Sequence, residues 1–592
     1  MFPMSPPAIL AACMFATTAA AQPSIAAAVT APTASFPMTI SVDAARPGRE
    51  LKPIYGFFGA DEPNYATMKD GRALLTELGQ LGGPQVYFRA HSLMVTGDGT
   101  PALKWGSTNM YTEDAHGRPI YDWTTVDRIF ETYLARGVKP YAQIGFMPQA
   151  LSVHPEPYQH RWRPGLPYDD VFTGWAYPPK DFARWEALVY EWVKHCVAKF
   201  GRTEVEQWYW EVWNEPNIGY WRGTREEFQK LHDHAIAGVR RALPTARVGG
   251  PDVAGAGGEF MQAFLEHALR GKNYATGRTG TPLDFISFHA KGSPSFVDGH
   301  VRMGIGAQLR TIDQGFARIA SFPELRATPI VIGESDPDGC AACQGPQLGY
   351  RNGTMYSSYT AAVFARTMLL AERHGVNLTG ALTWAFEFED QPYFAGFRAL
   401  ATNGIDLPVL NVFRMMAKMT GRRLPVVSTA ETAVDAMMRE GVRGDADVAA
   451  VASLGPGRLA VLVWHYHDED VPGPDANVRL TLGGLPDGLG LARLTHYRID
   501  ETHSNAYGAW KRLGSPMAPT RQHYMLLEAA GKLSTMDAPA TVSVDAGSSS
   551  LAFVLPRQAS RCCCSSGHRT GDAPCCARCT VPTSPQYPIR DS

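Results

Sequence analysis

The sequence predicts an α/β protein with a (β/α)8 TIM barrel followed by a C-terminal antiparallel β-sandwich domain, and three observations predict it. Short apolar runs alternate with helical patterns through the middle of the 592-residue chain. No glycine-rich phosphate turn follows the first run, which argues against an open doubly wound sheet, the competing architecture. After residue 420 the pattern changes to short alternating runs separated by Gly, Pro and Asp, as in a sandwich.

Eight runs have the short, apolar, β-branched or aromatic character of strands that are buried on both faces. They are residues 54–58, 85–91, 139–145, 207–213, 247–252, 283–289, 329–334 and 380–386. Helical patterns lie between them, and the clearest, over residues 181–200, repeats apolar residues at the spacing of one helix face. Eight strand-then-helix units predict a closed barrel over residues 50–400.

The remaining segments are assigned from composition. An apolar run that ends in small residues predicts a signal peptide over residues 1–21, and hence a periplasmic or secreted protein. A lipoprotein cleavage site at Cys13 is the alternative, and the run is too short for a permanent membrane span. Residues 36–49 are expected to add a strand to the sandwich, which occupies residues 401–556 together with a linking helix.

The cysteines are unevenly distributed. Cys340 and Cys343 form a C-A-A-C pair, which supplies only two of the four ligands that a structural zinc site needs. A local disulfide or two free thiols are therefore expected there. Residues 557–592 are rich in Cys and lack apolar periodicity, so we expect a disordered tail, with a zinc knuckle as the alternative.

The charge balance gives no sign of a nucleic-acid partner. Lys and Arg number 55 against 57 Asp and Glu, for a net charge of -2, and the basic residues form no stripe. A neutral surface of this kind leaves the oligomeric state open.

Two glutamates stand at predicted strand ends, where barrel enzymes carry their reacting groups. The fourth run ends in W-E-V-W-N-E-P-N with Glu215, and the seventh ends in I-V-I-G-E-S-D with Glu334. Cleavage of a glycosidic bond with retention needs two such groups about 5–5.5 Å apart. One is a carboxylic acid that protonates the departing oxygen, and the other is a carboxylate that attacks the anomeric carbon. Glu211, inside the fourth run, is expected to be structural.

Other strand-end residues are candidates for binding the sugar. The amide of Asn214 is placed to bond the hydroxyl next to the reacting carbon. His91 and His289 are candidates to bond further hydroxyls, although a lone strand-end histidine is as often held by structural partners. Trp384 is placed to stack under the sugar ring, with barrel packing as the alternative.

These motifs resemble a known family. W-N-E-P at the fourth strand, a lone glutamate at the seventh and a trailing sandwich resemble the retaining barrel glycosidases. F-I-S-F-H-A-K-G (residues 285–292), G-E-S-D-P (333–337) and R-A-H-S (89–92) narrow the resemblance to glycoside hydrolase family 39, which contains β-xylosidases and α-L-iduronidases. The resemblance covers residues 55–556. It implies that Glu215 is the acid/base and Glu334 the nucleophile, and a two-carboxylate mechanism requires no cofactor and no metal.

The same resemblance frames the choice of substrate. Lys291 resembles a lysine that iduronidases use for the substrate carboxylate, and Gly339 resembles their backbone donor. Against a uronide, Ala290 stands where iduronidases have arginine, and Asp338 is expected to repel an anionic sugar. We therefore expect a β-D-xyloside, with an arabinoside or an iduronide as alternatives.

Two long loops, after the second and third strands, predict a pocket that is closed at one end. The second loop carries six aromatic residues, namely Tyr158, Trp162, Tyr168, Phe172, Trp175 and Tyr177. Such a pocket favours exo-action on short plant-cell-wall oligosaccharides. A carbohydrate-binding protein without turnover is the alternative outside enzymes.

Overall fold

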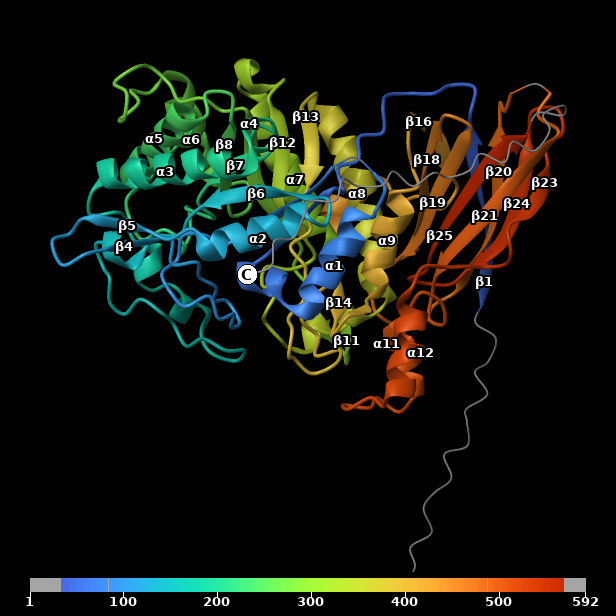
Figure 1. Ribbon diagram of the computed structural model, residues 1–592. Helices are drawn as coiled ribbons and strands as arrows, with labels where there is room; N and C mark the ends of the chain where they lie inside the picture. The colour runs from blue at the N-terminus through green and yellow to red at the C-terminus, as the bar shows by residue number, and fades with distance from the viewer. Residues whose placement is uncertain (1–33, 84, 487, 569–592) are drawn as a thin grey trace, which may run out of the picture.

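The computed structural model describes residues 34–83, 85–486 and 488–568 (Figure 1). A barrel and a sandwich lie side by side, and helix α8 (Thr354–His374) contacts strands of both. The predicted signal peptide lies outside the described residues. None of the helices in the described ranges combines the length and the apolarity needed to span a membrane.

The barrel sheet is parallel throughout, with its strands in sequence order around the axis. Its strands are β2 (Phe57–Ala60), β3 (Val86–Ala90), β6 (Val138–Ile144), β7 (Tyr209–Val212), β8 (Arg247–Val253), β9 (Phe285–Lys291), β12 (Pro329–Asp336) and β13 (Asn377–Ala381). The first and last strands meet where the N–H of Thr383 donates to the carbonyl of Phe57 over 3.0 Å. The predicted barrel is confirmed, and its parallel strand ends all open on one rim.

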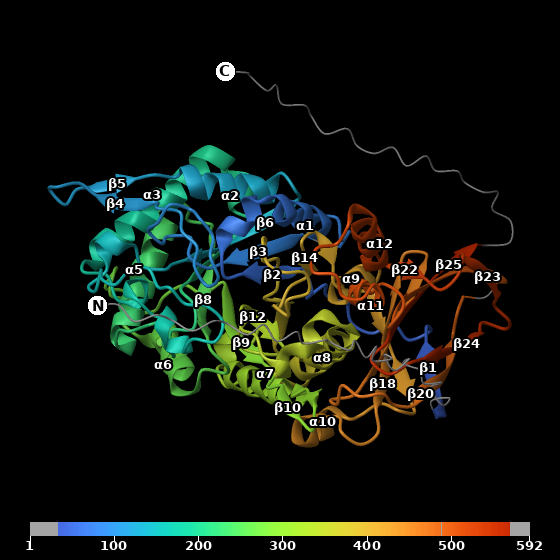
Figure 2. The same cartoon turned by 90° about the horizontal axis from the view of Figure 1, so that it is seen from below.

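Helices cover the outside of the barrel (Figure 2). They are α1 (Lys69–Gly79), α2 (Thr124–Leu134), α3 (Phe182–Phe200), the short α4 (Arg202–Val205), α5 (Arg225–Ala242), α6 (Gly258–Arg270), α7 (Ile305–Ala320), α8 and α9 (Pro408–Met416). α3 shows why the sequence predicted them well: the Asp181 side chain caps its first turn, and Gly201, at φ 86°, ends it. Its apolar stripe is buried, and Trp192 of the stripe packs 5.3 Å, between ring centroids, from Trp210 of β7.

Short elements decorate the rim and the connections. The hairpins are β4 (Tyr111–Glu113) with β5 (Pro119–Tyr121), β10 (Ser295–Val297) with β11 (His300–Arg302), and β14 (Ala401–Thr402) with β15 (Ile405–Asp406). The 3-10 turns are η1 (Pro63–Thr67), η2 (Gln149–Leu151), η3 (Tyr168–Val171), η4 (Gly174–Ala176), η5 (Pro323–Leu325) and η6 (Pro346–Asn352). η2, η3 and η4 lie in the long aromatic loop after the third barrel strand.

Two sheets form the second domain. One consists of β17 (Val426–Ser428), β1 (Ser35–Asp43), β20 (Asp475–Gly483) and β24 (Ser549–Leu555). The other consists of β16 (Arg422–Leu424), β18 (Asp447–Gly455), β19 (Arg458–Tyr466), β25 (Ser560–His568), β21 (Leu491–Ile499), β22 (Ser534–Thr535) and β23 (Ala540–Ser543). The helices α10 (Val434–Glu440), α11 (Ala506–Arg512) and α12 (Arg521–Gly531) complete it.

Pairing in the sandwich is antiparallel except at its N-terminal strand. β1 pairs with β20 in parallel and with β17 antiparallel, and it lies among the red C-terminal strands in Figure 1. The N-terminal residues of the described chain therefore belong to the C-terminal domain.

The expectation of a disordered tail over residues 557–592 is wrong for its first part. Residues 560–568 form β25, which pairs with both β19 and β21 inside the larger sheet. Cys562 and Cys564 point into the core that this sheet shares with the barrel, whereas Cys563 points into the core between the two sheets. Cysteine behaves here as a small apolar residue, so a strand that is buried on both faces forms without the usual Val and Ile. Residues 569–592 lie outside the described residues.

Cys340 and Cys343 form a disulfide, one of the two states that the sequence left open. The bridged turn lies directly after β12 and supplies backbone carbonyls to the Arg351 guanidinium.

Candidate active site

The rim at the carboxyl ends of the barrel strands brings the predicted catalytic side chains together. Glu215 follows β7 and Glu334 lies near the end of β12. Between them on the sheet, β9 contributes His289 and β8 contributes Asp252.

One histidine nitrogen defines the spacing of the two glutamates. His289 Nδ1 lies 2.9 Å from Glu215 Oε1 and 3.8 Å from Glu334 Oε1. Because these distances sum to 6.7 Å, the two carboxyl oxygens lie no farther apart than that. This bound includes the spacing of about 5–5.5 Å found in retaining glycosidases and excludes most of the wider range of about 6.5–9.5 Å found in inverting ones.

Both ring nitrogens of His289 are occupied by carboxyl groups. Nε2 lies 2.8 Å from Asp252 Oδ2, while Nδ1 bonds Glu215. Burial alone would lower the pKa of His289, but the Asp252 and Glu334 carboxylates outweigh burial and raise that pKa to about 10. The ring is therefore an imidazolium with no free N–H, and the sugar hydroxyl that the sequence assigned to it has no donor there.

Glu334 is surrounded by cations. Lys291 Nζ lies 2.5 Å from its Oε2, and Arg89 Nη1 lies 3.6 Å from its Oε1. Burial would raise the pKa of Glu334, but Lys291 and His289 outweigh it and hold this pKa well below its usual range. Glu334 is therefore a carboxylate at neutral pH, the form that a nucleophile requires.

Lys291 is engaged by two carboxylates. Besides Glu334, its ammonium lies 2.5 Å from Asp336 Oδ2. Its side chain thus supports the nucleophile, and only the part of its charge left by these two anions is available to a substrate.

Asn214 presents a free donor. Its Oδ1 accepts a hydrogen bond of 3.0 Å from Arg89 Nη2, which fixes the orientation of the amide. Its Nδ2 is buried and has no hydrogen-bond partner among the described residues. This buried amide therefore has an open donor, and its bond to a substrate hydroxyl stays a prediction.

Arg89 connects these parts and was not predicted. It is fully buried, donates to Glu211 Oε2 over 2.6 Å, and bonds Asp252. Glu211 also accepts from the Tyr141 hydroxyl, which agrees with a structural role. Arg89 and Asp252 each stand alone among apolar neighbours near a strand end, and that isolation was the signal available in the sequence.

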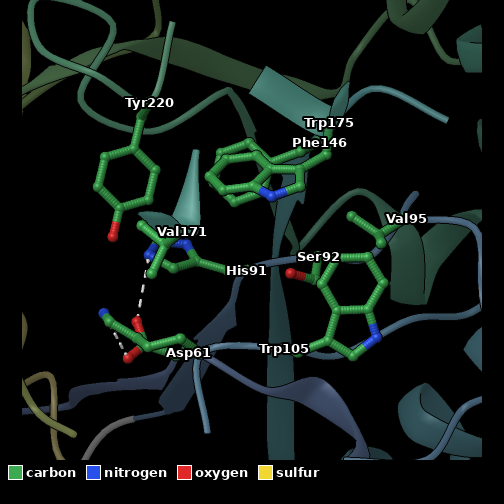
Figure 3. A pocket seen from close by; sticks show the side chains of 10 residues that line it. Asp61, His91, Ser92, Val95, Trp105, Phe146, Val171, Trp175 and Tyr220 are labelled. Carbon is green, nitrogen blue, oxygen red and sulfur yellow. Dashed lines mark hydrogen bonds and ion pairs between the residues drawn. The ribbon is translucent and has the colours of Figure 1, made fainter. Parts of the chain in front are cut away.

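A small cavity opens beside His91 (Figure 3). His91 Nε2 lies 3.6 Å from Asp61 Oδ1 and 3.7 Å from Glu334 Oε1, so the cavity adjoins the nucleophile. Asp61 pairs with Lys104 over 2.8 Å. Burial and Arg89 lower the pKa of His91 to about 3, so the ring is neutral. The cavity volume is about 20 Å³, room for about one water molecule.

The long aromatic loop forms part of this cavity wall. Val171 and Trp175 line it together with Tyr220, and Figure 3 shows these side chains facing Asp61 and His91. The Tyr168 hydroxyl lies 2.7 Å from that of Tyr220, which joins the loop to the segment that follows Glu215.

Trp384 lies in the barrel mouth but is only 2% exposed. Its Nε1 donates to Asp61 Oδ1 over 3.0 Å, and the Arg89 guanidinium lies 5.0 Å from its ring centroid. The ring also stands 4.3 Å from the His91 ring, between centroids. These contacts pack Trp384 against the polar centre of the site, and stacking under a sugar ring stays a prediction.

Asp338 was expected to repel an anionic sugar through an uncompensated charge, and this ground for the expectation is wrong. This carboxylate is paired with Arg351 over 2.6 Å and with Arg398 over 2.7 Å, and it is buried. Burial would raise the pKa of Asp338, but the two guanidinium groups hold it well below its usual range. The charge of Asp338 is thus compensated, which removes the reason for expecting it to repel an anionic sugar.

Within the described ranges, no group of three or more His, Cys, Asp or Glu side chains is arranged to hold a metal ion.

Comparisons with known proteins find glycosidases among the relatives of this chain. The chain is 26% identical to a β-xylosidase of Geobacillus stearothermophilus over 437 residues, which cover 70% of this chain and 75% of that protein. It is 29% identical to the α-L-iduronidase of Homo sapiens over 385 residues, which cover 58% and 54% of the two chains. Among solved structures, a monomeric β-xylosidase from Caulobacter crescentus CB15 superposes with a TM-score of 0.69 at 21% identity, covering 89% of this chain and 99% of that one.

The family assignment rests on a match over most of the chain. The model of the family described as "Glycosyl hydrolases family 39" matches residues 38–546. The chain is therefore a glycosidase and belongs to glycoside hydrolase family 39.

Proposed function

We propose that this glycosidase removes a terminal β-D-xylosyl residue from short plant-cell-wall oligosaccharides, with retention of configuration. The observation that carries the proposal is the contact of Glu215 and Glu334 with the same nitrogen of His289. Two carboxyl groups within 6.7 Å suit direct attack by one of them on the anomeric carbon.

In the first step, Glu334 attacks the anomeric carbon while Glu215 gives its proton to the departing oxygen. Lys291 and Arg89 keep Glu334 ionised and aimed until it reacts. Asn214 Nδ2 donates to the hydroxyl on the neighbouring sugar carbon, a contact that strengthens as positive charge develops in the transition state.

In the second step, water attacks the same carbon from the face that the aglycone has left. Glu215, now a carboxylate, takes a proton from that water, and the bond between the sugar and Glu334 breaks. The sugar is released with its original anomeric configuration.

The closed surroundings of His91 support a small terminal sugar. The cavity there has room for about one water. The aromatic rings of Trp105, Phe146 and Trp175 also line it. This cavity is too small to hold a sugar ring by itself, so it supports the proposal only as a crowded wall, beside which a pentopyranoside, with no branch at carbon five, needs less room than a hexopyranoside. The enclosing loops support exo-action.

The test is hydrolysis of chromogenic β-D-xyloside, α-L-arabinoside and α-L-iduronide by the wild type and by Glu334→Ala. We expect the xyloside to be the best substrate and Glu334→Ala to lose at least about 10⁴-fold in kcat. Proton NMR of the first-formed sugar should show the β-anomer. Release of the α-anomer would refute retention, and absence of turnover with every glycoside would favour a carbohydrate-binding protein. A chelator should leave the rate unchanged.

An α-L-iduronidase activity is the second candidate, and Asp338 favours it. Because Arg351 and Arg398 compensate this charge, one of the two objections to an anionic sugar is removed, and the other, Ala290 in place of arginine, remains. An iduronide that is cleaved faster than the xyloside would establish this candidate instead.

We further propose that the protein is periplasmic or secreted. The Cys340–Cys343 disulfide supports this location, because such bonds persist in oxidising compartments. N-terminal sequencing of the exported protein tests it, and a chain that begins near residue 22 is expected.

A further inference from the structure

His289 contacts both catalytic carboxyl groups, so its role is not limited to either one of them. It is fully buried, and its Nδ1 contacts both Glu215 and Glu334, while Asp252 holds Nε2. A substrate-binding histidine would leave a ring nitrogen open to the pocket, and this one does not.

The charges that face His289 come from every strand around it. Asp252 on β8, Glu334 on β12 and Glu215 after β7 are the acids. Arg89 on β3 bonds Asp252, and Lys291 on the same strand as His289 bonds Glu334. Each of these two cations neutralises one acid in part, yet the remaining field keeps the ring protonated.

We propose that His289 is a positioning residue that keeps a fixed positive charge between the two catalytic carboxyl groups, serving Glu334 before the glycosyl-enzyme forms and Glu215 afterwards. The proposal rests on the double-displacement mechanism above. It gives Asp252 the task of orienting the ring, because the carboxylate on Nε2 directs the other N–H to the catalytic pair.

Proton and charge counts support this exchange of partners. The double displacement starts with an anionic Glu334, a cationic His289 and a proton on Glu215. Glycosylation moves that proton to the departing oxygen, which also receives the electron pair of the broken bond, and esterifies Glu334. The only change among the three side chains is that the negative charge passes from Glu334 to Glu215.

His289 keeps both protons throughout, and its Nδ1 is already 2.9 Å from the oxygen of the new anion. The buried cation therefore always has one anionic catalytic partner. Hydrolysis returns the charge to Glu334 when water gives a proton to Glu215 and the ester bond breaks.

The test compares two aryl β-D-xylosides with the variant His289→Gln, which keeps an N–H donor but removes the charge. Phenyl xyloside needs the proton of Glu215, whereas 2,4-dinitrophenyl xyloside leaves without it. Loss of the cation destabilises the carboxylate that forms on Glu215, so kcat/KM should fall at least about tenfold more for the phenyl substrate. For the same reason, the alkaline limb of the phenyl xyloside profile should move to higher pH.

His91→Gln is the matched control. His91 lies 3.7 Å from Glu334 but makes no hydrogen bond to Glu215 in the described structure. Its replacement should therefore lower kcat/KM by the same factor for both substrates. Asp252→Asn, which keeps His289, is the second variant and should show the same dependence on the leaving group. Thermal unfolding checks that each variant is folded.

The positioning role would be overturned if His289→Gln and Asp252→Asn lowered kcat/KM equally for both substrates and left the alkaline limb of the phenyl xyloside pH profile unchanged. A wild type without activity on either xyloside would instead refute the proposed substrate, so the two failures are distinguishable.

Discussion

Replacement of Arg89 by methionine should destabilise the protein strongly, and the contacts of Arg89 set the size of the effect. The guanidinium is fully buried and contacts Glu211, Asp252 and Glu334. Removing one partner of a buried ion pair costs about 3–5 kcal/mol, because the other charge is left without compensation. At about 2 °C per kcal/mol for a large domain, Arg89→Met should lower the Tm by at least about 6 °C.

The loss of stability in Arg89→Met should be larger at high pH than at low pH. Burial already raises the pKa of Glu211 to about 7 with Arg89 present. Without Arg89 the folded-state pKa of Glu211 rises further above its unfolded value, so the penalty is full at high pH and shrinks as Glu211 protonates on acidification. Thermal unfolding at about pH 5 and about pH 8 measures this difference.

Arg118→Met is the matched control for Arg89→Met. Arg118 pairs with Asp114 over 2.7 Å, but its side chain is 75% exposed. An exposed pair contributes about 0–1 kcal/mol, so the control should change the Tm little at either pH. A loss in Arg89→Met no larger than in the control, or one that is equal at both pH values, would refute this account of the site.

Three further predictions concern the same site and its surroundings. Lys291→Met removes the cation that contributes most to the low pKa of Glu334, so the acid limb of kcat/KM should move to higher pH, and an unmoved limb would contradict this pairing. His289, with a folded-state pKa of about 10, stabilises the fold below its unfolded pKa of about 6.5 and loses this contribution as pH rises through 10. The Tm difference between wild type and His289→Gln should therefore shrink in that range, which calorimetry would detect. Cys343→Ser opens a loop closed by a sequence separation of 3, so it should cost about 2 kcal/mol, and a Tm equal to that of wild type would argue against a structural bridge.

The parts of the site that the sequence predicted are those with a local signal. Glu215 stands in a strand-end motif with Asn214 and Trp213, and Glu334 ends another apolar run, so periodicity and motif locate both. The local signal for Asp252 and Arg89 is weaker, a single charge near the end of an apolar run, and its meaning depends on partners on other strands. Only the closed barrel brings these partners together.

Two errors have the same origin. Asp338 was judged as a charge without partners, whereas it is compensated by Arg351 and Arg398, 13 and 60 residues later in the sequence. β25 was missed because its run of cysteines was judged by composition, whereas two neighbouring strands and two cores provide the burial that makes it a strand. Local patterns do not contain either kind of information.

The strand β1 ties the beginning of the described chain to its end. The Ser35 hydroxyl accepts a hydrogen bond from Asn477, 442 residues later, within the parallel β1–β20 pair. A ribosome makes residues 35–43 early, yet their partner strand appears only after the whole barrel has been synthesised. The barrel can fold as a unit in the meantime, while the apolar side of β1 waits for its sheet. Completion of the sandwich is thus delayed to the last part of synthesis, the interval in which an unpaired strand edge is most exposed to association with other chains.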